Sequence, residues 1–310
     1  MSDSKRKILL VVDGSYQSFE TVHYLSEALP PSSTEVVLLH VMSRVPEAFW
    51  DLEKDPAWQQ KVQTVKGWEV QQEKKISDFM KRAGQVFADA GFPSNAIKVD
   101  VRNRNKGIAR DIGEESHKGY DAVIIGRRGL STIQDLSLGG VASKVVLKVR
   151  DLAVWLVGGK PEPDKIIIGF DASDGAMLAV DHVGKMAQGT KKQILLLHVI
   201  RKGNNDIDNA EFQQFQKERM QSAVKEIEPV IENAVGRLVQ AGIPSDRISS
   251  KVITGATTRA GSILEEAKAG DYGTVVVGRR GVSTVEEFDM GRVSNKLVQA
   301  AKDRALWVVG

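Results

Sequence analysis

The chain has 310 residues, of which 42% are hydrophobic and 27% charged, a composition typical of folded globular proteins. Lys and Arg (43) nearly balance Asp and Glu (40), so the net charge of +3 gives no indication of a nucleic acid or an anionic membrane as partner. The absence of cysteine excludes disulfides, thiol catalysis and cysteine-bound metals. The length predicts two domains of roughly 150 residues each.

The first apolar segment, Ile8–Val12, follows basic residues as the core of an export signal would. It is short, however, and Asp13 ends it at once, so it predicts a strand. No apolar run approaches the roughly 18 residues that a membrane span needs. We therefore expect a cytoplasmic protein that contacts neither membrane nor nucleic acid.

The two halves of the sequence repeat one another, with the matching segments in the same order. The sequence therefore predicts a tandem duplication, with domains at 1–159 and 160–310 and a short Pro-rich linker, KPEPD, at 160–164. The matching segments are VVDGS (11–15) and GFDAS (169–173), VVLLHV (36–41) and LLLHV (195–199), AGFPS (90–94) and AGIPS (241–245), GRRG (126–129) and GRRG (278–281), and GGVASKV (139–145) and GRVSNKL (291–297).

Each copy alternates short apolar runs with helical patterns. Apolar residues recur at steps of three and four over residues 76–90, which predicts a helix, and again around 224–238, where Pro229 is expected to kink or break the helix. Alternation of this kind predicts a parallel sheet with right-handed crossovers. The strands predicted in the first copy are 8–12, 36–41, 97–101, 122–125 and 154–157.

The copies differ mainly after the second strand, where the first is longer by several residues and carries Phe49, Trp50, Trp58 and Trp68. The simpler interpretation is a longer helix whose aromatic side chains pack on the other copy. The alternative is a lid that closes over a bound ligand.

The candidate ligand-binding residues lie where strands end. The first strand ends in an acid in each copy, Asp13 and Asp171, and the fourth ends in a glycine loop, Gly126–Gly129 and Gly278–Gly281. In doubly wound sheets these strands are neighbours at the switch in strand order, where ligands bind. Another glycine, Gly139 or Gly291, then opens a helix whose free amides attract phosphate. These parts together predict a mononucleotide site.

Each part also has a structural interpretation. Asp13 and Asp171 are also suited to capping the first helix of their copies. The loop arginines either meet phosphate or are solvated or paired with acids of the helices. His40 and His198 end buried strands and are interpreted as core residues, not as bases or metal ligands. Ser15 and Ser173 have no base nearby in the sequence, so no catalytic residue is predicted.

With its Gly-two-Gly-nine-Gly spacing, strand-end Asp and His-Val at the second strand, the sequence resembles the universal stress protein family in its tandem form, over almost its whole length. The resemblance implies Rossmann-like domains of the adenine nucleotide alpha hydrolase type, each with a five-stranded parallel sheet of order 3-2-1-4-5 flanked by helices. It implies ATP as ligand, with the Asp at ribose or metal, the second-strand Val backbone at adenine and the glycine loops at phosphate. Asp13 would thus hold Mg²⁺ through the phosphates. The implied binding residues are Asp13, Val41, Gly126, Gly129, Gly139, Gly140 and Val141 in the first copy and Asp171, Val199, Gly278, Gly281, Gly291, Val293 and Ser294 in the second.

Both copies depart from the ATP-binding pattern of the family at one position. That pattern has Ser or Thr directly after the third glycine, whereas Gly140 and Arg292 stand there in this chain. Losing one such hydroxyl contact costs roughly 0.5–1.5 kcal/mol, which weakens a site without abolishing it. Ser143 and Ser294 lie close by in sequence and are candidates to replace the contact in part.

The leading hypothesis is a cytoplasmic stress-response protein that binds adenine nucleotide in at least one copy. ATP hydrolysis, if it occurs, would be slow, because no general base or lysine clamp is evident. One alternative is a structural or signalling member of the family that binds no nucleotide. Another is a nucleotide-dependent transferase, which would need a catalytic loop that neither repeat contains.

The last apolar strand of each copy, 154–157 and 306–309, predicts how the copies meet. In the implied strand order it lies at the edge of the sheet, where an open apolar edge invites aggregation. We expect the two strands to pair antiparallel as an intramolecular pseudo-dimer, with Trp155 and Trp307 near its axis. A homodimer of the whole chain would then have to use other surfaces.

Overall fold

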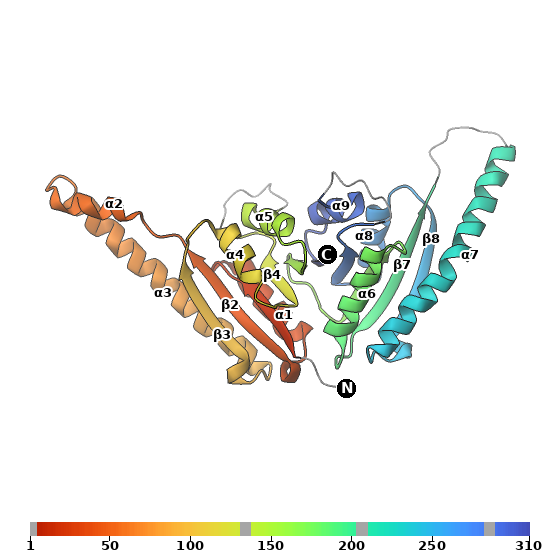
Figure 1. Ribbon diagram of the computed structural model, residues 1–310, viewed down its shortest axis with the longest axis horizontal. Coiled ribbons are helices and arrows are strands. Elements are labelled where there is room, and N and C mark those ends of the chain that lie inside the picture. The colour runs from red at the N-terminus through yellow and green to blue at the C-terminus, as the bar shows by residue number, and fades with distance from the viewer. Residues whose placement is uncertain (1–4, 131–137, 203–209, 282–288) are drawn as a thin grey trace.

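The computed structural model describes residues 5–130, 138–202, 210–281 and 289–310. Its two halves lie side by side, with the long helices at the two ends of the molecule (Figure 1). The first half contains β1 (Arg6–Val11), α1 (Tyr16–Ala28), η1 (Pro31–Ser33), β2 (Thr34–Met42), α2 (Glu47–Trp50), η2 (Asp51–Lys54), α3 (Gln59–Asp89), η3 (Ser94–Ala96), β3 (Ile97–Asn103), α4 (Ile108–Ser116), β4 (Ala122–Gly126), α5 (Gly140–Lys148) and β5 (Ala153–Val157).

The second half repeats this order of elements, without a counterpart of α2 and η2 among the described residues. It contains β6 (Lys165–Phe170), α6 (Asp174–Ala187), β7 (Gln193–Arg201), α7 (Ala210–Gln240), η4 (Ser245–Arg247), β8 (Ile248–Ala256), α8 (Arg259–Ala269), β9 (Thr274–Gly278), α9 (Arg292–Ala300) and β10 (Ala305–Val309).

In the described part of the chain the strands form one ten-stranded sheet of order β3-β2-β1-β4-β5-β10-β9-β6-β7-β8. All pairings within each half are parallel. The order 3-2-1-4-5 is thus confirmed in both copies, and each predicted strand of the first copy overlaps an observed one.

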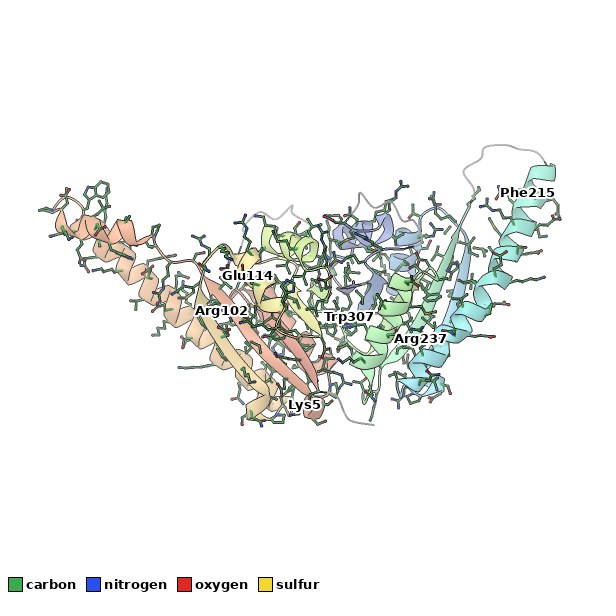
Figure 2. All side chains as sticks on the ribbon, viewed as in Figure 1. Lys5, Arg102, Glu114, Phe215, Arg237 and Trp307 are labelled. Carbon is green, nitrogen blue, oxygen red and sulfur yellow. The ribbon has the colours of Figure 1, made fainter. Side chains whose placement is uncertain are left out.

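The two halves join through β5 and β10, which pair antiparallel as predicted. Trp155 lies opposite Trp307 in this register. Their rings are stacked, with centroids 3.6 Å apart and planes 5° from parallel, and both side chains are completely buried. Figure 2 shows Trp307 between the halves. The paired strands leave neither apolar edge open, which removes the aggregation hazard of an exposed strand.

Each interface tryptophan donates its indole N–H to the first helix of the opposite copy. Trp155 Nε1 donates to His182 Nε2 of α6 at 3.0 Å, and Trp307 Nε1 donates to Tyr24 Oη of α1 at 3.0 Å. Tyr24 Oη also lies 2.8 Å from Thr274 Oγ1, and its burial raises its pKa. His182 and Tyr24 occupy equivalent helix positions, so each interface tryptophan has a polar partner on the helix across the pseudo-twofold axis.

Acidification should destabilise the protein through His182. Burial lowers the pKa of this imidazole from 6.5 to about 4, with smaller opposed effects of Asp121 and Lys185. The unfolded chain therefore binds a proton between pH 6.5 and 4 that the folded chain does not, and stability falls over that range by up to about 3 kcal/mol. His182→Gln keeps an acceptor for Trp155 without titrating and should lose less between pH 7 and 4 in urea unfolding. Equal losses in both proteins would rule out this role of His182.

Alternation along the strands explains the two-layered core. Ile8 and Leu10 face one side of β1 and Leu9 and Val11 face the other, and all four are buried. Helices α1, α3, α6 and α7 pack on the first side, and α4, α5, α8 and α9 pack on the second. The carboxyl ends of β1 and β4 thus lie between two helix layers and are open to a ligand. The same holds for β6 and β9.

The structure differs from two sequence expectations about the long helices. Pro229, expected to kink or break its helix, does not break α7, which runs from Ala210 to Gln240 with the proline inside. Pro229 and Lys225, whose carbonyl would have accepted the missing N–H, are both exposed, so water can replace that bond. The aromatic residues near the start of α3 do not pack on the other copy, because α3 lies beside the outer strand β3 at the far end of the sheet (Figure 1).

Candidate functional site

A crevice opens at the carboxyl end of the sheet in the first copy, where β1 and β4 are neighbours. Its volume is about 420 Å³, within the roughly 300–1,000 Å³ typical of small-molecule sites. All the binding residues predicted for this copy line it, and we call it crevice one. These residues are Asp13, Val41, Gly126, Gly129, Gly139, Gly140 and Val141.

Asp13 connects the end of β1 to the glycine loop. Its Oδ1 accepts from the amide of Ser15 at 3.0 Å and from the hydroxyl of Ser18 at 2.5 Å, while Oδ2 accepts from the amide of Leu130 at 3.1 Å. The helix cap itself is Ser15, whose hydroxyl accepts from the amide of Ser18. Asp13 therefore holds the loop against the first helix, and does not itself cap that helix.

Close packing explains the glycine at position 129. A Cβ atom there would lie 2.1 Å from Asp13 Oδ2, far inside van der Waals contact. At Gly139 a Cβ would lie 3.2 Å from the carbonyl oxygen of Arg127, which accepts a hydrogen bond from the Gly139 amide at 2.7 Å. The two glycines let the loop and the start of α5 approach each other and Asp13 closely.

The first turn of α5 supplies the anion-binding part of crevice one. The amides of Gly140, Val141 and Ala142 lie in the first turn, where an α-helix offers them no carbonyl. The positive end of the helix dipole adds to this attraction for phosphate. A Cβ at Gly140 would meet nothing within 4 Å, so this position is open to a larger side chain.

Gly140→Ser should strengthen the binding of ATP in crevice one. The hydroxyl would restore the phosphate contact that the family pattern has, and the open space around Gly140 accommodates it without a shift of the loop. One such bond contributes roughly 0.5–1.5 kcal/mol, which is about a 2- to 12-fold gain in affinity. Calorimetric titration with ATP measures the gain, and Gly113→Ser in α4, at a residue that does not line the crevice, is the control. Unchanged or weaker binding in Gly140→Ser would argue against phosphate at this position.

The side walls of crevice one are apolar. They include Val11, Ile108 and Ile125 from the sheet and α4, and Trp68 from α3. Trp68 remains 48% exposed, so part of its ring surface is open to a ligand. His40 lies in the wall with Nδ1 2.8 Å from the carbonyl oxygen of Val12. The sequence singled out Trp68 only as part of an aromatic cluster, and a place beside the crevice fits the lid interpretation better than packing on the other copy.

The second copy has a corresponding crevice of about 580 Å³, which we call crevice two. A Cβ at Gly281 would lie 2.2 Å from Asp171 Oδ2, as in the first copy, and Asp171 Oδ1 accepts from the Ser173 hydroxyl at 2.5 Å. The hydroxyl of Ser294 donates to the carbonyl of Gly278 at 2.7 Å and is buried, so it does not replace the missing phosphate contact. The predicted residues that line this crevice are Asp171, Val199, Gly278, Gly281, Gly291, Val293 and Ser294.

The first arginine of each glycine loop turns away from its own crevice. The buried guanidinium of Arg127 donates to the carbonyl of Val298 in α9, and Arg279 donates to the carbonyls of Val146 (2.8 Å) and Val149 (2.6 Å) at the end of α5. Each thus caps the carboxyl end of a helix of the other copy, where a cation is favourable. Burial lowers the pKa of Arg127 to about 10 and also lowers that of Arg279. The interpretations of these two arginines as phosphate contacts of their own crevice or as solvated side chains are wrong, because both are buried against the other copy.

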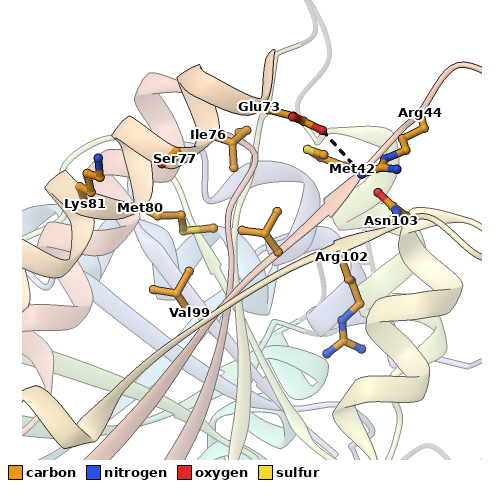
Figure 3. A pocket seen from close by; sticks show the side chains of 11 residues that line it. Met42, Arg44, Glu73, Ile76, Ser77, Met80, Lys81, Val99, Arg102 and Asn103 are labelled. Atoms are coloured by element: carbon orange, nitrogen blue, oxygen red, sulfur yellow. Dashed lines mark ion pairs between the residues drawn. The ribbon is translucent and has the colours of Figure 1, made fainter. Parts of the chain in front are cut away.

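Another cavity, about 740 Å³, is an open groove between α3 and β3 (Figure 3). Ile76, Met80 and Val99 point into it, and an ion pair between Arg44 and Glu73, at 3.6 Å, spans its rim. It borders crevice one, but the glycine loop residues do not line it. In crevice one and crevice two, by contrast, the strand-end Asp, the glycine loop and the amino end of a helix meet. Their meeting favours these two crevices as functional sites.

Within the described ranges, no group of three or more His, Asp or Glu side chains is arranged to hold a metal ion. The helices of the same ranges include none that combines the length and the apolar character of a membrane span.

Comparisons with known proteins agree with this architecture. The universal stress protein family model matches the chain twice, over residues 5–152 and 163–307. The curated Universal stress protein YxiE of Bacillus subtilis is 26% identical over 141 residues, which cover 44% of this chain and 92% of that protein. A solved universal stress protein from Archaeoglobus fulgidus shares the fold, with a TM-score of 0.63 and 18% identity over 100% of this chain and 99% of that chain. A functionally unknown protein from Pseudomonas aeruginosa gives a TM-score of 0.57 and 12% identity over 99% and 93%.

The fold and the two crevices define a tandem α/β protein with a ligand-type crevice at each switch in strand order. The chain belongs to the universal stress protein family and carries two copies of its domain.

Proposed function

We propose that the protein binds an adenine nucleotide, ATP, in crevice one and acts in a stress response of the cytoplasm. The observation that carries the proposal is the meeting of Asp13, the glycine loop and the amino end of α5 in one crevice with apolar walls. Apolar walls suit a base, and helix amides suit phosphate. The domains of this tandem protein are proposed to be residues 1–159 and 160–310, acting as an intramolecular pseudo-dimer.

In this proposal each part of crevice one has a role. The backbone of Val41 and the apolar walls hold adenine, and the carboxylate of Asp13 accepts from ribose or holds Mg²⁺. The amides of Gly140 and Val141 and the backbone of the loop hold the phosphates. A magnesium ion would supply charge neutralisation on those phosphates. No described residue of the crevice is placed as a lysine clamp, so we expect hydrolysis to be slow.

Equilibrium titration with a fluorescent ATP analogue tests the proposal. The signal should saturate, unlabelled ATP should displace the analogue, and Asp13→Ala should weaken binding because the loop loses its anchor and the ligand loses an acceptor. Asp55→Ala, an exposed acid remote from both crevices, is the control. The absence of binding up to millimolar ATP would reject the proposal.

One observation favours a second candidate, a structural or signalling member that binds no nucleotide. Asp13 already accepts three hydrogen bonds from the protein, so it has a complete structural role without a ligand. In that case Asp13→Ala would lower the free energy of unfolding, and ATP would stabilise neither the native chain nor the variant.

A further inference from the structure

Crevice one and crevice two differ in charge at equivalent positions. Ser43 in the first copy corresponds to Arg201, two residues past the His-Val that both copies share. The helix that follows the third strand of each copy begins with Ile108 in α4 but with Arg259 in α8. The first residue of the next helix is Gly140 in α5 but Arg292 in α9. Three neutral positions around one crevice are therefore arginines around the other.

The difference extends to the long helices. Trp68 of α3 and Arg219 of α7 stand at the same position, counted back from the ends of their 31-residue helices. Trp68 lines crevice one, whereas Arg219 lines a cavity of about 510 Å³ that shares His198, Arg201 and Arg259 with crevice two. The cationic surface is thus continuous from the glycine loop of the second copy to α7.

Seven cationic side chains line crevice two and this adjoining cavity, and all are exposed to solvent. Among the described lining residues, Asp171 is the single carboxylate, and it already accepts from Ser173. None of the seven forms an ion pair with a described residue. The seven are Arg201, Lys202, Arg219, Arg259, Arg280, Arg292 and Lys296.

A further contact makes crevice two less suited to adenine than crevice one. Arg259 Nε lies 3.3 Å from the carbonyl oxygen of Val199 and donates to it, although Val199 is the strand residue whose backbone would meet adenine. The neighbouring His198 has its pKa lowered by burial and, to a smaller extent, by the charge of Arg259. The region around the strand end is thus arranged for negative charge more than for a base.

We propose that crevice two, with its adjoining cavity, binds a small molecule that carries several phosphate groups, whereas crevice one takes the adenine nucleotide. Arginine forks bind phosphate oxygens in pairs, and converging arginines repel one another until an anion neutralises them. The proposal goes beyond the nucleotide function proposed above, because it concerns the other crevice and needs no adenine.

Inorganic tripolyphosphate is the probe, titrated calorimetrically into the full chain. Exchanging the three arginines for their first-copy equivalents, Arg201→Ser, Arg259→Ile and Arg292→Gly, should weaken binding at least tenfold. The matched control removes three exposed lysines of the second copy that line neither cavity, Lys191→Ser, Lys225→Ser and Lys268→Ser, and should change binding less than threefold. The reverse exchange, Ser43→Arg, Ile108→Arg and Gly140→Arg, should add a second tripolyphosphate site and tests the proposal even where the first triple variant folds poorly.

The outcomes are distinguishable from those of the nucleotide proposal. The arginine triple variant should keep the ATP affinity of crevice one while it loses tripolyphosphate. Equal tripolyphosphate binding in the native chain and the arginine triple variant, or an equal loss in the lysine control, would overturn the inference. So would a single-stranded oligonucleotide that binds more tightly than tripolyphosphate and displaces it, because the surface would then serve nucleic acid. Failure of ATP alone to bind would reject the nucleotide proposal and leave this one standing.

Discussion

Trp155→Ala is expected to lower the free energy of unfolding by about 3–5 kcal/mol, the usual cost of removing a buried tryptophan. Trp155 is completely buried and stacks on Trp307 across the junction of the two copies. Its indole N–H also donates to His182, so the substitution leaves a half-buried imidazole nitrogen without its donor. A loss of this size at one residue would show that the junction is a main source of stability.

Urea unfolding followed by circular dichroism measures this effect. Trp58→Ala is the matched control, because Trp58 is 39% exposed and lies far from the junction, and it should change stability by less than about 1 kcal/mol. Trp307→Ala should resemble Trp155→Ala, since the two residues are related by pseudo-symmetry. A cost for Trp155→Ala no larger than that for Trp58→Ala would mean that the copies stand independently.

Gly129→Ala is expected to weaken ATP binding at crevice one at least tenfold. The added Cβ would lie 2.1 Å from Asp13 Oδ2, so either the loop or the carboxylate must move by more than an ångström. That movement separates the loop backbone from Asp13 and from the first turn of α5, which are the proposed partners of one ligand. A tenfold loss corresponds to about 1.4 kcal/mol, well within the cost of such a displacement.

Two other glycines serve as controls in the same ATP titration. A Cβ at Gly113 in α4 meets nothing within 4 Å, so Gly113→Ala should bind ATP as the native chain does. Gly281→Ala makes the corresponding clash with Asp171 in the second copy and should leave crevice one intact. Loss of ATP binding in Gly281→Ala, with normal binding in Gly129→Ala, would show that the nucleotide binds in crevice two and not in crevice one.

Much of the fold could be predicted from the sequence because local signals agreed with one another. Continuous apolar runs marked the buried parallel strands, and the repeated order of motifs implied two equal sheets. The family resemblance then supplied the strand order, which placed Asp13 beside Gly129. Residues at the ends of neighbouring strands meet by topology alone, so their meeting needs no knowledge of side-chain packing.

The features that sequence reasoning missed depend on contacts between the copies. Arg127 and Arg279 cap helices of the opposite copy, and nothing in a GRRG segment tells which of its two arginines turns inward. The partners of the interface tryptophans, His182 and Tyr24, lie on helices that sequence patterns place only as amphipathic segments. Such pairs are fixed by the three-dimensional docking of surfaces, which periodicity does not encode.

The arginines around crevice two are visible in the sequence, but no sequence pattern groups them as a set. More than fifty residues separate Arg201 from Arg259, and more than thirty separate Arg259 from Arg292. Each of the three belongs to a different element. Only their arrangement around one cavity shows that they act together.

Native mass spectrometry of the full chain with ATP tests the central claim most directly, because it counts nucleotides per chain. The account predicts one ATP bound at micromolar nucleotide, retained by Gly281→Ala and bound at least tenfold more weakly by Gly129→Ala. A native chain without any ATP adduct, or a Gly129→Ala variant that binds ATP as tightly as the native chain, would contradict it.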